Sequence, residues 1–530
     1  MQPLATRIDE LAQRSPQAPA FLCGDARLSW AQYAERSDLL AGHLIDRGLC
    51  PGDRVAVLLP DGPGVHAAFV GCEKAGLVVV GIGPRAGLAE IRHLLARSGA
   101  RALVARPWHR GLDLEGLVHA SRGAGLALEH FVPVEGQLEP GEPVLREARP
   151  PTAAERHRRL GVDDLFLLNS TSGTTGLPKC VTHHQARWLH FHRLAVEAGE
   201  LREDDVFLSA LPAPFGFGLW TAHFTPTLLG APTLLLESFD AGEMIRQIER
   251  HRVTVLAAVS TQLIMMLNHP EIVARELSSL RALFTGGEAV PFERAAEFEQ
   301  RTGAAVLQFY GSNETGALSR TTTRDPREKR LRTAGRLIPE MQVRLYDDQG
   351  REVTEQGEGQ PACRGPLASR GYYGDEEANR QLFTPDGWMK TGDIARIDEQ
   401  GYLQVIGRSA DFIIRGGKNI SGPAVEEAVS AHPAVALAAA VAMPDPVYGE
   451  RVCVYVELQP GSPELGLEAL TAFLADRGVS KEWFPERLMV VDALPRASGG
   501  KIAKGELRAD IRRRLAAETS EPPATSRSGS

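Results

Sequence analysis

The sequence predicts an α/β protein: a large N-terminal domain of parallel α/β subdomains with an added β layer, followed by a small α+β C-terminal domain. Three observations support this prediction. Short apolar runs alternate with helical periodicity over roughly the first two thirds of the chain. Short strands with turn signals replace that pattern after residue 335. From residue 407 a stretch of about 110 residues has its own helices and strands, and it is long enough to fold as a separate domain.

The first hundred residues have the pattern of β–α–β units. Apolar residues from Trp30 to Ile45 recur at three-to-four spacing, which predicts an amphipathic helix that ends near Gly48. A second helix is expected at 88–95. Apolar runs bounded by Gly, Pro or Asp predict strands at 54–59, 77–82 and 102–105. Strands that alternate with helices in this way favour a parallel sheet covered by helices.

Residues 131–158 lose this periodicity and are rich in Pro, Glu and Arg, which predicts a surface excursion or a plain linker. The α/β pattern then resumes, with strands expected at 205–211, 233–236, 253–259 and 304–309. The C-terminal domain is expected to contain a helix at 424–432, strands at 435–442 and 452–458, and a helix at 467–477. Residues 517–530 carry no large apolar side chain and are expected to be disordered.

The composition excludes several classes of protein. The 530 residues include 59 basic and 67 acidic ones, for a formal charge of −8, and show no basic stripe, so we expect no nucleic-acid partner. No apolar stretch approaches the roughly 18 residues that a membrane span needs. The N-terminus has no apolar signal core, and the six cysteines show no CxxC spacing. We therefore expect no metal knuckle and a reducing, cytoplasmic location.

The segment from Ser170 to Lys179 carries the clearest chemical signal. After Ser170 it contains hydroxyl residues and glycines, namely Thr171, Ser172, Gly173, Thr174, Thr175 and Gly176. The glycines let the backbone turn tightly and present N–H groups, the hydroxyls add donors, and Lys179 supplies a cation, which together make an anion cradle. The spacing differs from a Walker loop. A flexible linker is the alternative, but it does not explain Pro-Lys in a chain with eight lysines and 51 arginines.

This loop resembles the phosphate-binding signature of the adenylate-forming superfamily, which comprises acyl-CoA synthetases, carrier-loading adenylation domains and beetle luciferases. Four further segments resemble that family's motifs in the same order along the chain. They are Tyr310-Gly311-Ser312-Asn313-Glu314-Thr315, Gly387 to Asp393, Gly407-Arg408 with residues 411–419, and Pro495 to Lys501. On this resemblance the chain is identified as a member of the acyl-CoA synthetase branch.

The resemblance also implies a domain organisation. Residues 1–407 would form the adenylate-forming domain, 408–411 a hinge that includes Ala410, 412–516 a mobile C-terminal domain, and 517–530 a disordered tail. Relatives rotate the small domain between two half-reactions. This rotation would remove Lys501 from the site and bring in the loop at Gly416.

The same resemblance implies a reaction in which a carboxylate attacks the α-phosphorus of ATP in the presence of Mg²⁺. The expected catalytic residues are Glu314, Lys179 and Lys501. Glu314 would bind the metal, and Lys179 would supply the positive charge of the phosphate loop. Lys501 would reach the carboxylate and α-phosphate oxygens. Asp393 would accept hydrogen bonds from the ribose hydroxyls. Further nucleotide contacts are expected from residues 171–176, Glu288, Tyr310 by stacking on adenine, Gly311, Ser312, Asn313 and Arg408.

On the acyl side, Phe215 occupies the place of the family's aromatic gate between acyl pocket and thiol tunnel. Amino-acid-activating relatives follow this aromatic with an aspartate, whereas this chain has Gly216, so a substrate amine would lack a partner. The other glycines expected at the pocket are Gly218, Gly286, Gly287 and Gly316. Together they suggest a roomy pocket for a bulky aryl, alicyclic or other apolar acid. Turn formation is the alternative role for these glycines.

For the second half-reaction, Gly416, Gly417 and Lys418 would let pantetheine pass close to the backbone, and Tyr448 would stack on the adenine of coenzyme A. The expected partners are a small-molecule carboxylic acid, ATP and coenzyme A, with a carrier protein as the alternative acyl acceptor. Histidines at 183, 184, 190 and 192 follow the phosphate loop but do not share one helix face. We interpret them as ordinary surface or core residues.

Three positions depart from the family pattern. Cys180 stands where glycine is usual and would crowd the loop, and Asn313 replaces a threonine. Ala410 stands close to the hinge position that Asp or Lys usually occupies; a hinge there lacks the polar side chain, whereas a hinge at Asp411 keeps it. These departures motivate a second hypothesis, an enzyme that is strong in only one half-reaction. A ligand-sensing or scaffold role is disfavoured because the lysines and carboxylates of the motifs are all present.

Overall fold

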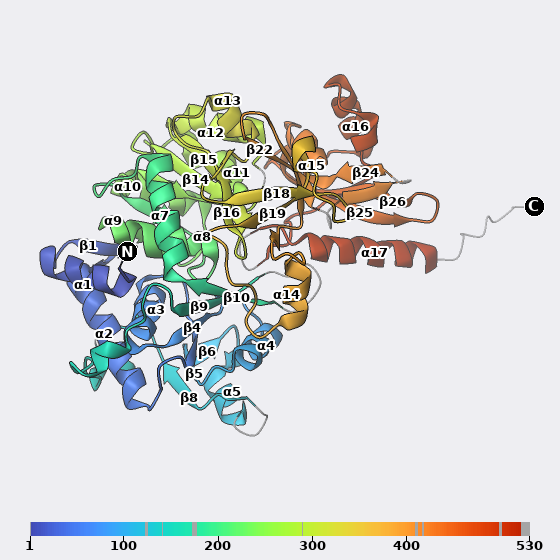
Figure 1. The fold of residues 1–530 in the computed structure, drawn as a ribbon. Helices are drawn as coiled ribbons and strands as arrows, with labels where there is room; N and C mark the ends of the chain where they lie inside the picture. Colours follow the sequence, from blue (N-terminus) through green and yellow to red (C-terminus); the bar gives the residue numbers. More distant parts are fainter. Residues whose placement is uncertain are drawn as a thin grey trace, which may run out of the picture. The chain divides into compact units, whose positions relative to one another are not determined.

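The computed structural model describes residues 2–121, 126–139, 141–171, 178–288, 290–408, 412–415, 418–497 and 501–520 (Figure 1). The chain divides into two compact units. The larger comprises Met1–Thr391, Ala395–Val405 and Ser498–Gly500, and the smaller comprises Gly392–Ile394, Ile406–Ala497 and Lys501–Ser530. Within the described ranges, no helix combines the length and the apolar character that crossing a membrane requires.

One sheet of the larger unit has the strand order β10–β9–β4–β3–β5–β8. Its strands are β3 (Arg54–Leu58), β4 (Val78–Gly81), β5 (Ala102–Ala105), β8 (His130–Pro133), β9 (Leu165–Ser170) and β10 (Cys180–His184). Neighbouring strands are parallel except β10, which runs antiparallel to β9. Every residue of β4 is buried, as expected for a parallel strand with both faces covered. The β–α–β prediction for this region is confirmed.

A second sheet of the larger unit has the order β17–β16–β15–β14–β13–β11–β12–β1–β2. Its strands are β1 (Pro19–Cys23), β2 (Ala26–Ser29), β11 (Phe207–Ser209), β12 (Thr233–Leu235), β13 (Val255–Ala257), β14 (Ala282–Gly286), β15 (Ala305–Ser312), β16 (Gly316–Arg320) and β17 (Arg336–Leu337). It is parallel from β1 to β15 and antiparallel at both edges. The strands expected around 207, 233, 255 and 305 are therefore confirmed, within a few residues at their ends.

Helices cover both sheets. They are α1 (Leu4–Arg14), α2 (Trp30–Asp46), α3 (Pro63–Ala75), α4 (Leu88–Ser98), α5 (Leu114–Ser121), α6 (Pro143–Arg146), α7 (Gln185–Gly199), α8 (Gly216–Gly218), α9 (Thr225–Leu229), α10 (Ala241–His251), α11 (Ser260–Asn268), α12 (Phe292–Thr302), α13 (Arg327–Arg332) and α14 (Glu376–Leu382). A π-helical turn spans Leu219–Phe224, and 3₁₀ turns span Glu155–Arg158, Pro270–Val273 and Thr354–Gln356. Helix α2 begins where Ser29 and Gln32 form a reciprocal capping box, which satisfies backbone donors at its start.

The β layer after residue 335 is also present. Its sheet has the order β18–β19–β21–β22, and β20 pairs with β19. The strands are β18 (Gln342–Tyr346), β19 (Glu358–Arg364), β20 (Met389–Lys390), β21 (Asp393–Ile397) and β22 (Leu403–Arg408). The pairings of β19 with β18, β20 and β21 are antiparallel, as the turn signals predict. A separate small hairpin joins β6 (Trp108–His109) to β7 (Leu112–Asp113).

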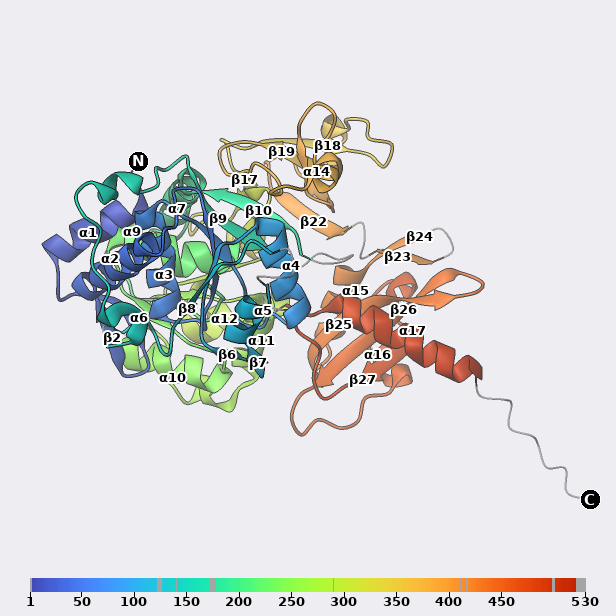
Figure 2. The same ribbon diagram turned by 90° about the horizontal axis from the view of Figure 1, so that it is seen from below.

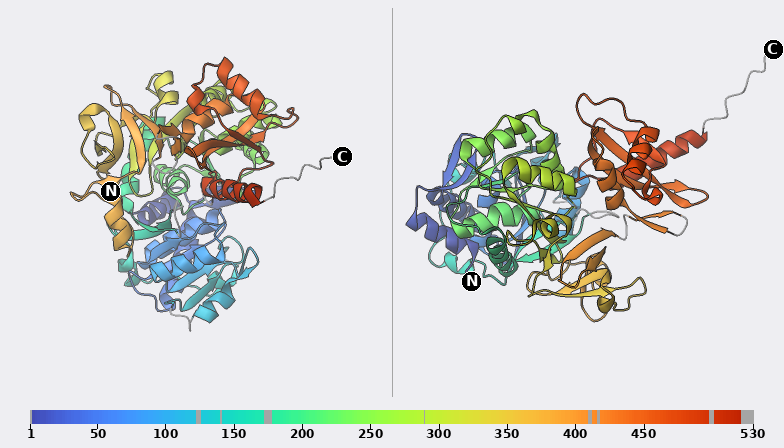
Figure 3. Two further views of the ribbon diagram at one scale, coloured as in Figure 1. Left: turned by 90° about the vertical axis from the view of Figure 1, so that its right-hand side faces the viewer. Right: turned by 90° about the horizontal axis from the view of Figure 1, so that it is seen from above.

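The smaller unit is built on a sheet of order β24–β23–β26–β25, with β27 parallel to β26. Its elements are β23 (Phe412–Arg415), β24 (Lys418–Ser421), α15 (Gly422–Ser430), β25 (Val435–Asp445), β26 (Gly449–Leu458), α16 (Leu467–Asp476), a 3₁₀ turn (Lys481–Trp483), β27 (Arg487–Val490) and α17 (Lys504–Ser520). Apolar residues of β25 and β26 pack with α15 and α16 around Val425, Val454 and Leu470. Figures 2 and 3 show α17 lying along this sheet. The α+β prediction is confirmed.

Helix α3 is buried along its whole length, including the ammonium group of Lys74. Lys74 Nζ lies 2.9 Å from Oδ1 of Asp9 and 2.9 Å from Oδ1 of Asp38, and it donates to the carbonyl of Ala34 at 3.2 Å. A buried charge costs several kcal/mol of solvation unless it is paired, and Lys74 is paired twice. This lysine therefore joins α1, α2 and α3.

The expectation of a surface excursion or linker at 131–158 is wrong for 131–145, which holds a strand and core residues, whereas much of 146–158 is exposed. Strand β8 pairs in parallel with β5, and Leu138 and Val144 are buried in the main core. Gln137 Oε1 accepts from the backbone N–H of Gly64 at 2.8 Å, and its carbonyl accepts from Arg36 at 3.1 Å. The large apolar residues of this segment are spaced too irregularly to give a periodic signal, but Val132, Val134, Leu138, Val144 and Leu145 are all buried.

The expected start of a disordered tail at 517 is also wrong, because α17 continues to Ser520. Glu518 pairs with Arg487, whose Nη1 lies 3.0 Å from its Oε2, and Ala and Glu are good helix formers. The pairing ties the last turn of α17 to β27. Residues 521–530 lie outside the described residues.

Candidate active site

The chain between β9 and β10 is a hairpin loop, because Ser170 pairs with Cys180 across the two strands. The N–H of Thr171 donates to the carbonyl of Lys179 at 3.1 Å, which closes the base of the loop. Lys179 and Thr171, both predicted at the phosphate site, therefore lie together at this base. Ser172, Gly173, Thr174, Thr175 and Gly176 fall outside the described residues.

Helix α4 lies beside β10 (Figures 1 and 2). Its side chains bind the chain just before β10 and the segment at 374–375. His93 Nε2 lies 3.0 Å from the carbonyl oxygen of Pro178, and since that oxygen only accepts, Nε2 carries the hydrogen. Arg97 donates to the carbonyl of Gly374 at 3.2 Å and pairs with Asp375. The helix thus holds the end of the phosphate loop and the segment at 372–375 in one place.

Cys180 does not crowd the loop. Its thiol is buried in the apolar cluster that α4 forms with β4 and β5, and burial raises its pKa to about 11. A thiol held neutral in such surroundings is neither a nucleophile nor a metal ligand. The prediction that Cys180 crowds the loop assumes a side chain that points to the loop, whereas this side chain packs in the core.

Glu314 sits at a tight turn that follows β15. The hydroxyls of Ser312 and Thr315 bond the backbone there: Ser312 N–H donates to Thr315 Oγ1 at 3.0 Å, and Glu314 N–H donates to Ser312 Oγ at 3.2 Å. The carbonyl of Glu314 accepts from the N–H of Ser369 at 2.7 Å. These bonds fix the backbone of the predicted metal ligand on both sides.

Tyr372 connects the two predicted catalytic residues of the larger unit. Its hydroxyl donates to Oε1 of Glu314 at 2.8 Å, and Lys179 Nζ lies 4.9 Å from the centre of its ring. Burial, with the charge of Glu314, raises the pKa of Tyr372 far above its usual value, so the hydroxyl stays protonated and remains a donor. A cation over an aromatic face is attracted by the ring's quadrupole. Lys179 and Glu314 are therefore held around one tyrosine.

Arg187, in α7, is a buried cation behind this turn. Its Nε donates to the carbonyl of Leu367 at 2.8 Å, Nη2 to the carbonyl of Asn313 at 2.9 Å, and Nη1 lies 3.0 Å from Nδ1 of His183. Burial lowers the pKa of Arg187 to about 10, and the negative charge of Glu314 opposes that shift. At neutral pH it is a cation that braces the backbone next to Glu314.

Phe215 begins the predicted acyl side of the site, at the start of α8, and the glycines around it have structural reasons. A Cβ on Gly218 would collide with the carbonyl of Pro212, one on Gly286 with that of Phe309, and one on Gly316 with that of Leu367. Gly316 also has φ +67°, which other residues rarely adopt. Close backbone approach accounts for these three glycines. The pocket role of these residues, and of the exposed turn residue Gly287, stays a prediction.

The remaining predicted nucleotide contacts of the larger unit are Tyr310 and Gly311 in β15, and Glu288 after β14. Tyr310 is half-buried and pairs with Ser319 of β16. A Cβ on Gly311 would collide with the carbonyl of Gly316, so this glycine is required for the turn itself. The structure places Tyr310, Gly311 and Glu314 on one continuous β-turn segment.

Three further predicted site residues, Asp393, Lys501 and Tyr448, belong to the smaller unit. Asp393 begins β21 and is buried. Lys501 is half-buried and closes a hairpin in which the N–H of Ala497 donates to the Lys501 carbonyl at 2.7 Å. Tyr448 is 49% exposed in the turn after β25, where its N–H donates to Asp445 at 2.7 Å. An exposed aromatic on a fixed turn is available for stacking.

Several predicted residues cannot be placed. Ala410, Gly416 and Gly417 lie outside the described residues, and so do the side chains of Arg408 and Lys418, whose backbones belong to β22 and β24.

Among the described residues, no group of three or more His, Cys, Asp or Glu side chains is arranged to hold a metal ion. His183, however, is not ordinary. It is fully buried, it lies between Arg187 and Asn169, and its pKa is held well below the usual value by burial and by Arg187. The interpretation of His183 as a plain core residue missed this network.

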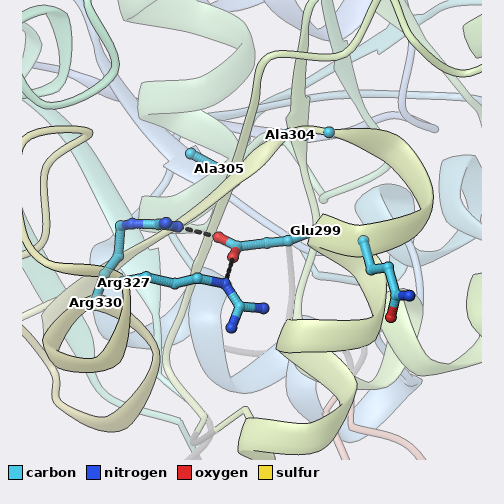
Figure 4. A pocket seen from close by; sticks show the side chains of 7 residues that line it. Glu299, Ala304, Ala305, Arg327 and Arg330 are labelled. Atoms are coloured by element: carbon cyan, nitrogen blue, oxygen red, sulfur yellow. Dashed lines mark hydrogen bonds and ion pairs between the residues drawn. The ribbon is translucent and has the colours of Figure 1, made fainter.

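A separate hollow lies between α12, α13 and the start of β15 (Figure 4). It is lined by Glu299, Gln300, Gly303, Ala304, Ala305, Arg327 and Arg330. Glu299 pairs with Arg330 and accepts from Arg327 Nε at 2.8 Å, so its charges are already used within the protein (Figure 4). None of the motif residues lines it, and we assign it no chemistry.

Sequence reasoning also missed Tyr372, Arg187 and Asn169. Tyr372 follows Gly371 in a Gly-Tyr-Tyr run that carries no obvious chemical signal, and Asn169 and Ser170 end a strand whose first four residues are apolar. A large polar side chain directly after such an apolar run is the one feature of β9 that could have drawn notice.

Comparisons with known proteins agree with the motifs. The AMP-binding enzyme family matches residues 8–373, and the AMP-binding enzyme C-terminal domain matches residues 424–501. The chain is 34% identical over 532 residues to a salicylyl-CoA synthase / salicylate adenylyltransferase of Streptomyces, covering 96% of this chain and 94% of that protein. It is 31% identical over 505 residues to the medium-chain fatty-acid–CoA ligase of Escherichia coli K12, covering 94% and 88%.

Among solved structures, ATP-bound MatB from Rhodopseudomonas palustris has a TM-score of 0.84 to this chain at 25% identity, covering 97% of this chain and 99% of that one. A fold shared over nearly the full length of both chains agrees with the two family matches. The chain therefore belongs to the family of AMP-binding, adenylate-forming enzymes.

Proposed function

We propose that the protein is an ATP-dependent acid:CoA ligase that activates a bulky aryl, alicyclic or other apolar carboxylic acid as an acyl-adenylate and then transfers the acyl group to the thiol of coenzyme A. One observation carries the proposal: Lys179, at the base of the hairpin loop, and Glu314 are held around Tyr372. A cation and a hard carboxylate close to the base of this loop support binding of phosphate and metal there. The salicylate and fatty-acid relatives act on carboxylic acids, according to their names.

In the first half-reaction, a carboxylate oxygen of the acid attacks the α-phosphorus of ATP. The bond from that phosphorus to the bridging oxygen breaks, and pyrophosphate leaves with the electron pair. Two anions must approach each other, so the protein has to supply positive charge and fixed donors. Lys179 and the loop backbone would contact phosphate oxygens, and Lys501 would contact the carboxylate and α-phosphate oxygens where charge builds.

Mg²⁺ fits the residues present. This ion often binds through one or two carboxylates together with substrate phosphates, and it does not need a cage of protein ligands. Glu314 offers such a carboxylate, and its orientation is fixed by the hydroxyl of Tyr372. Glu314 would hold the ion, which would neutralise charge on the phosphates of ATP.

The nucleoside would be held by Asp393 at the ribose and by Tyr310 at the adenine, with Arg408 and Glu288 as further contacts. Asp393 is a buried carboxylate at the start of a strand, which suits a fixed acceptor for two hydroxyl groups. Phe215 would form the aromatic wall of the acyl pocket. The absence of an aspartate after it supports an acid without an amine, because a buried ammonium group needs a partner.

In the second half-reaction, the sulfur of coenzyme A attacks the acyl carbon, AMP leaves with the electron pair, and the thiol proton passes to solvent. Gly416, Gly417, Lys418 and the exposed Tyr448 would bind the coenzyme. We propose a hinge at 408–411 that separates an adenylate-forming domain, residues 1–407, from a mobile domain, residues 412–516. The division of the chain into two compact units near residue 406 supports that boundary.

An enzyme strong in only one half-reaction is the second candidate, and Asn313 is the observation that favours it. Its amide stands where the family usually has a hydroxyl, next to the predicted metal ligand. The burial of the Cys180 side chain among apolar residues removes one of the three reasons for this hypothesis. The name of the salicylate relative joins a CoA synthase to an adenylyltransferase.

A screen of carboxylic acids tests the proposal. Aryl, alicyclic and fatty acids are incubated with the protein, ATP and Mg²⁺, with or without coenzyme A, and adenylates and thioesters are measured by mass spectrometry. We expect an acyl-adenylate without coenzyme A and a thioester with it. Absence of any adenylate across the panel would contradict the proposal, and transfer confined to a phosphopantetheinylated carrier would replace it with the carrier-loading alternative.

A further inference from the structure

The loop that carries Phe215, residues 212–216, is fastened by side chains from three other segments of the larger unit. One lies after β3, one ends β9, and one lies in the turn before Glu314. The bonds are Asp61 Oδ1 accepting from Ala213 N–H at 2.9 Å, Asn169 Nδ2 donating to the Pro214 carbonyl at 3.1 Å, and Asn313 Oδ1 accepting from Gly216 N–H at 3.0 Å.

Both backbone groups of Phe215 itself are hydrogen-bonded to nearby residues of the chain. The N–H of Phe215 donates to the carbonyl of Pro212 at 3.2 Å, and the carbonyl of Phe215 accepts from the N–H of Leu219 at 2.8 Å. Pro212 and Pro214 have no N–H to satisfy. Since the backbone groups around Phe215 are bonded on both sides, this loop cannot shift without breaking several bonds at once.

Asn169 is the centre of the arrangement, and its hydrogen bonds can be given a direction. It is 1% exposed, and its amide donates both to Pro214 and to Oδ1 of Asn313, the latter at 3.2 Å. Its Oδ1 lies 2.8 Å from Nε2 of His183 and can only accept, so Nε2 carries the hydrogen. His183 Nδ1 then accepts from Arg187. The chain of donors runs from Arg187 through His183 and Asn169 to the loop.

Asn313 and Gly216 form a matched pair. Oδ1 of Asn313 accepts from both Asn169 and Gly216, and a Cβ on Gly216 would collide with that oxygen. A Cβ there would also lie 3.3 Å from Cη2 of Trp188. The amide of Asn313 thus occupies the space that a side chain at 216 would need.

We propose that Asn169 and Asn313 are positioning residues that fix the loop bearing Phe215 and so determine which acids the enzyme accepts. The juxtaposition of one buried amide on β9 with another on the turn at 313 carries this inference. Neither side chain needs to touch the reacting atoms. The part of the inference that concerns acids rests on the proposed function, whereas the part that concerns the loop does not.

The chemical consequence is a rigid wall in the acyl pocket. An aromatic side chain on a fixed backbone can turn about its own bonds but cannot retreat to make room for a different acid. A pocket with rigid walls discriminates between acids of different shape. Because discrimination by shape alone is modest, a wall that can move would lose much of it. Loosening the clamp is therefore expected to weaken binding of the preferred acid more than binding of ATP.

Hydrogen exchange of the backbone amides tests the clamp without any acid. Asn169→Ala removes the hydrogen bond to the Pro214 carbonyl of the loop and the one to Asn313, which itself holds Gly216. Asn268→Ala, at the end of α11, is a matched asparagine variant outside the network. In peptides that cover residues 206–220, we expect exchange to be faster by about tenfold or more in Asn169→Ala. Exchange as slow as in the wild type and in Asn268→Ala would overturn the proposal.

Kinetics test the link to acid selection, with pyrophosphate exchange as the assay. Asn169→Ala is expected to raise KM for the preferred acid by about tenfold while KM for ATP changes by less than about threefold. The ratio of kcat/KM between the preferred acid and a smaller one should also fall. Equal changes in KM for acid and for ATP, or an unchanged ratio, would overturn the role in selection and leave only general damage to the fold.

The matched pair gives a second test that remains valid if Asn169→Ala does not fold. Gly216→Ala alone should lose acid activation, because its Cβ collides with Asn313. The double variant Gly216→Ala with Asn313→Thr should recover part of it, because the shorter side chain frees the space. Full activity of Gly216→Ala, or a double variant no better than that single one, would overturn the proposal. A wild-type protein that activates no acid would refute the proposed function, while the exchange experiment would still decide on the clamp.

Discussion

The hydroxyl of Tyr372 donates a 2.8 Å hydrogen bond to Oε1 of Glu314, and the same ring lies under Nζ of Lys179. Glu314 and Tyr372 are 58 positions apart in the chain; Glu314 lies at a turn after β15 and Tyr372 lies after β19. This bond orients the carboxylate that is proposed to hold Mg²⁺. Tyr372 therefore contacts two of the proposed site residues, although it lies outside the motifs that the sequence shows.

Tyr372→Phe keeps the ring under Lys179 and removes only the hydroxyl. A hydrogen bond to a charged group contributes roughly 1.5–3 kcal/mol, so we expect kcat/KM to fall by about tenfold or more. Because the missing bond acts on the metal ligand, the Mg²⁺ concentration for half-maximal rate should rise as well. Both are measured by pyrophosphate exchange over a Mg²⁺ series.

Tyr373→Phe is the matched control for that experiment. Tyr373 is the next residue and packs against the apolar cluster of α4, so its ring is retained in the variant. We expect no change in the Mg²⁺ requirement. Equal effects of the two substitutions would contradict the role of Tyr372.

Lys501→Ala separates the two half-reactions. The lysine is proposed to act only where charge builds on the carboxylate and α-phosphate, so adenylation should fall by at least about a hundredfold. Thioester formation from a supplied acyl-adenylate should change by less than about threefold. Comparable losses in the two assays would be inconsistent with the assigned role.

Lys74→Ala tests the buried ion pairs that join α1, α2 and α3. Lys74 is 2% exposed, and its removal leaves Asp9 and Asp38 without their shared cation. Breaking such a pair usually costs about 3–5 kcal/mol, so the free energy of unfolding in urea should fall by about that amount. Lys329→Ala is the comparison, because its pair with Asp398 is partly exposed and should contribute about 1 kcal/mol or less.

Asp61 makes the stability of the larger unit depend on pH. Burial raises its pKa to about 7 from 3.8, with Arg85 opposing the shift and Glu237 adding to it. The unfolded chain releases this proton between pH 3.8 and 7 while the folded chain keeps it, so stability is lost as pH rises through that window. The full cost, up to about 4 kcal/mol, applies above pH 7.

Asp61→Asn is expected to remove that cost while keeping an oxygen for the N–H of Ala213. Unfolding free energies of the variant and the wild type should agree near pH 4 and diverge towards pH 8, with the variant more stable. Glu73, whose pKa burial also raises to about 7, is present in both proteins and cancels in the difference. A constant difference across the pH range would show that Asp61 does not titrate in this way.

Local patterns were sufficient for much of the fold. Strands such as Ala102–Ala105 are short apolar runs between turn residues, and α2 has both periodicity and a capping box. The prediction for 131–145 failed because the buried residues there are irregularly spaced and follow neither the helical nor the strand period. Packing against β5, which lies earlier in the chain, decides the structure of this segment.

The candidate site divides in the same way. Lys179, Glu314 and Phe215 lie in contiguous motifs, so the sequence alone is enough to propose them as site residues. Arg187 and Asn169 act through partners more than a hundred residues away, at Leu367 and Asn313. Their roles depend on which strand ends and helices the fold brings together, and a single sequence does not contain that information.

The attack of the acid's carboxylate on the α-phosphorus of ATP is the central claim, and an isotope experiment tests it directly. An accepted acid labelled with ¹⁸O in both carboxylate oxygens is turned over with ATP, Mg²⁺ and coenzyme A, and AMP is analysed by mass spectrometry. One ¹⁸O should appear in the phosphate of AMP, because the bridging oxygen stays with phosphorus when the thiol displaces AMP. Unlabelled AMP, or label in inorganic phosphate with ADP as the product, would contradict the acyl-adenylate route.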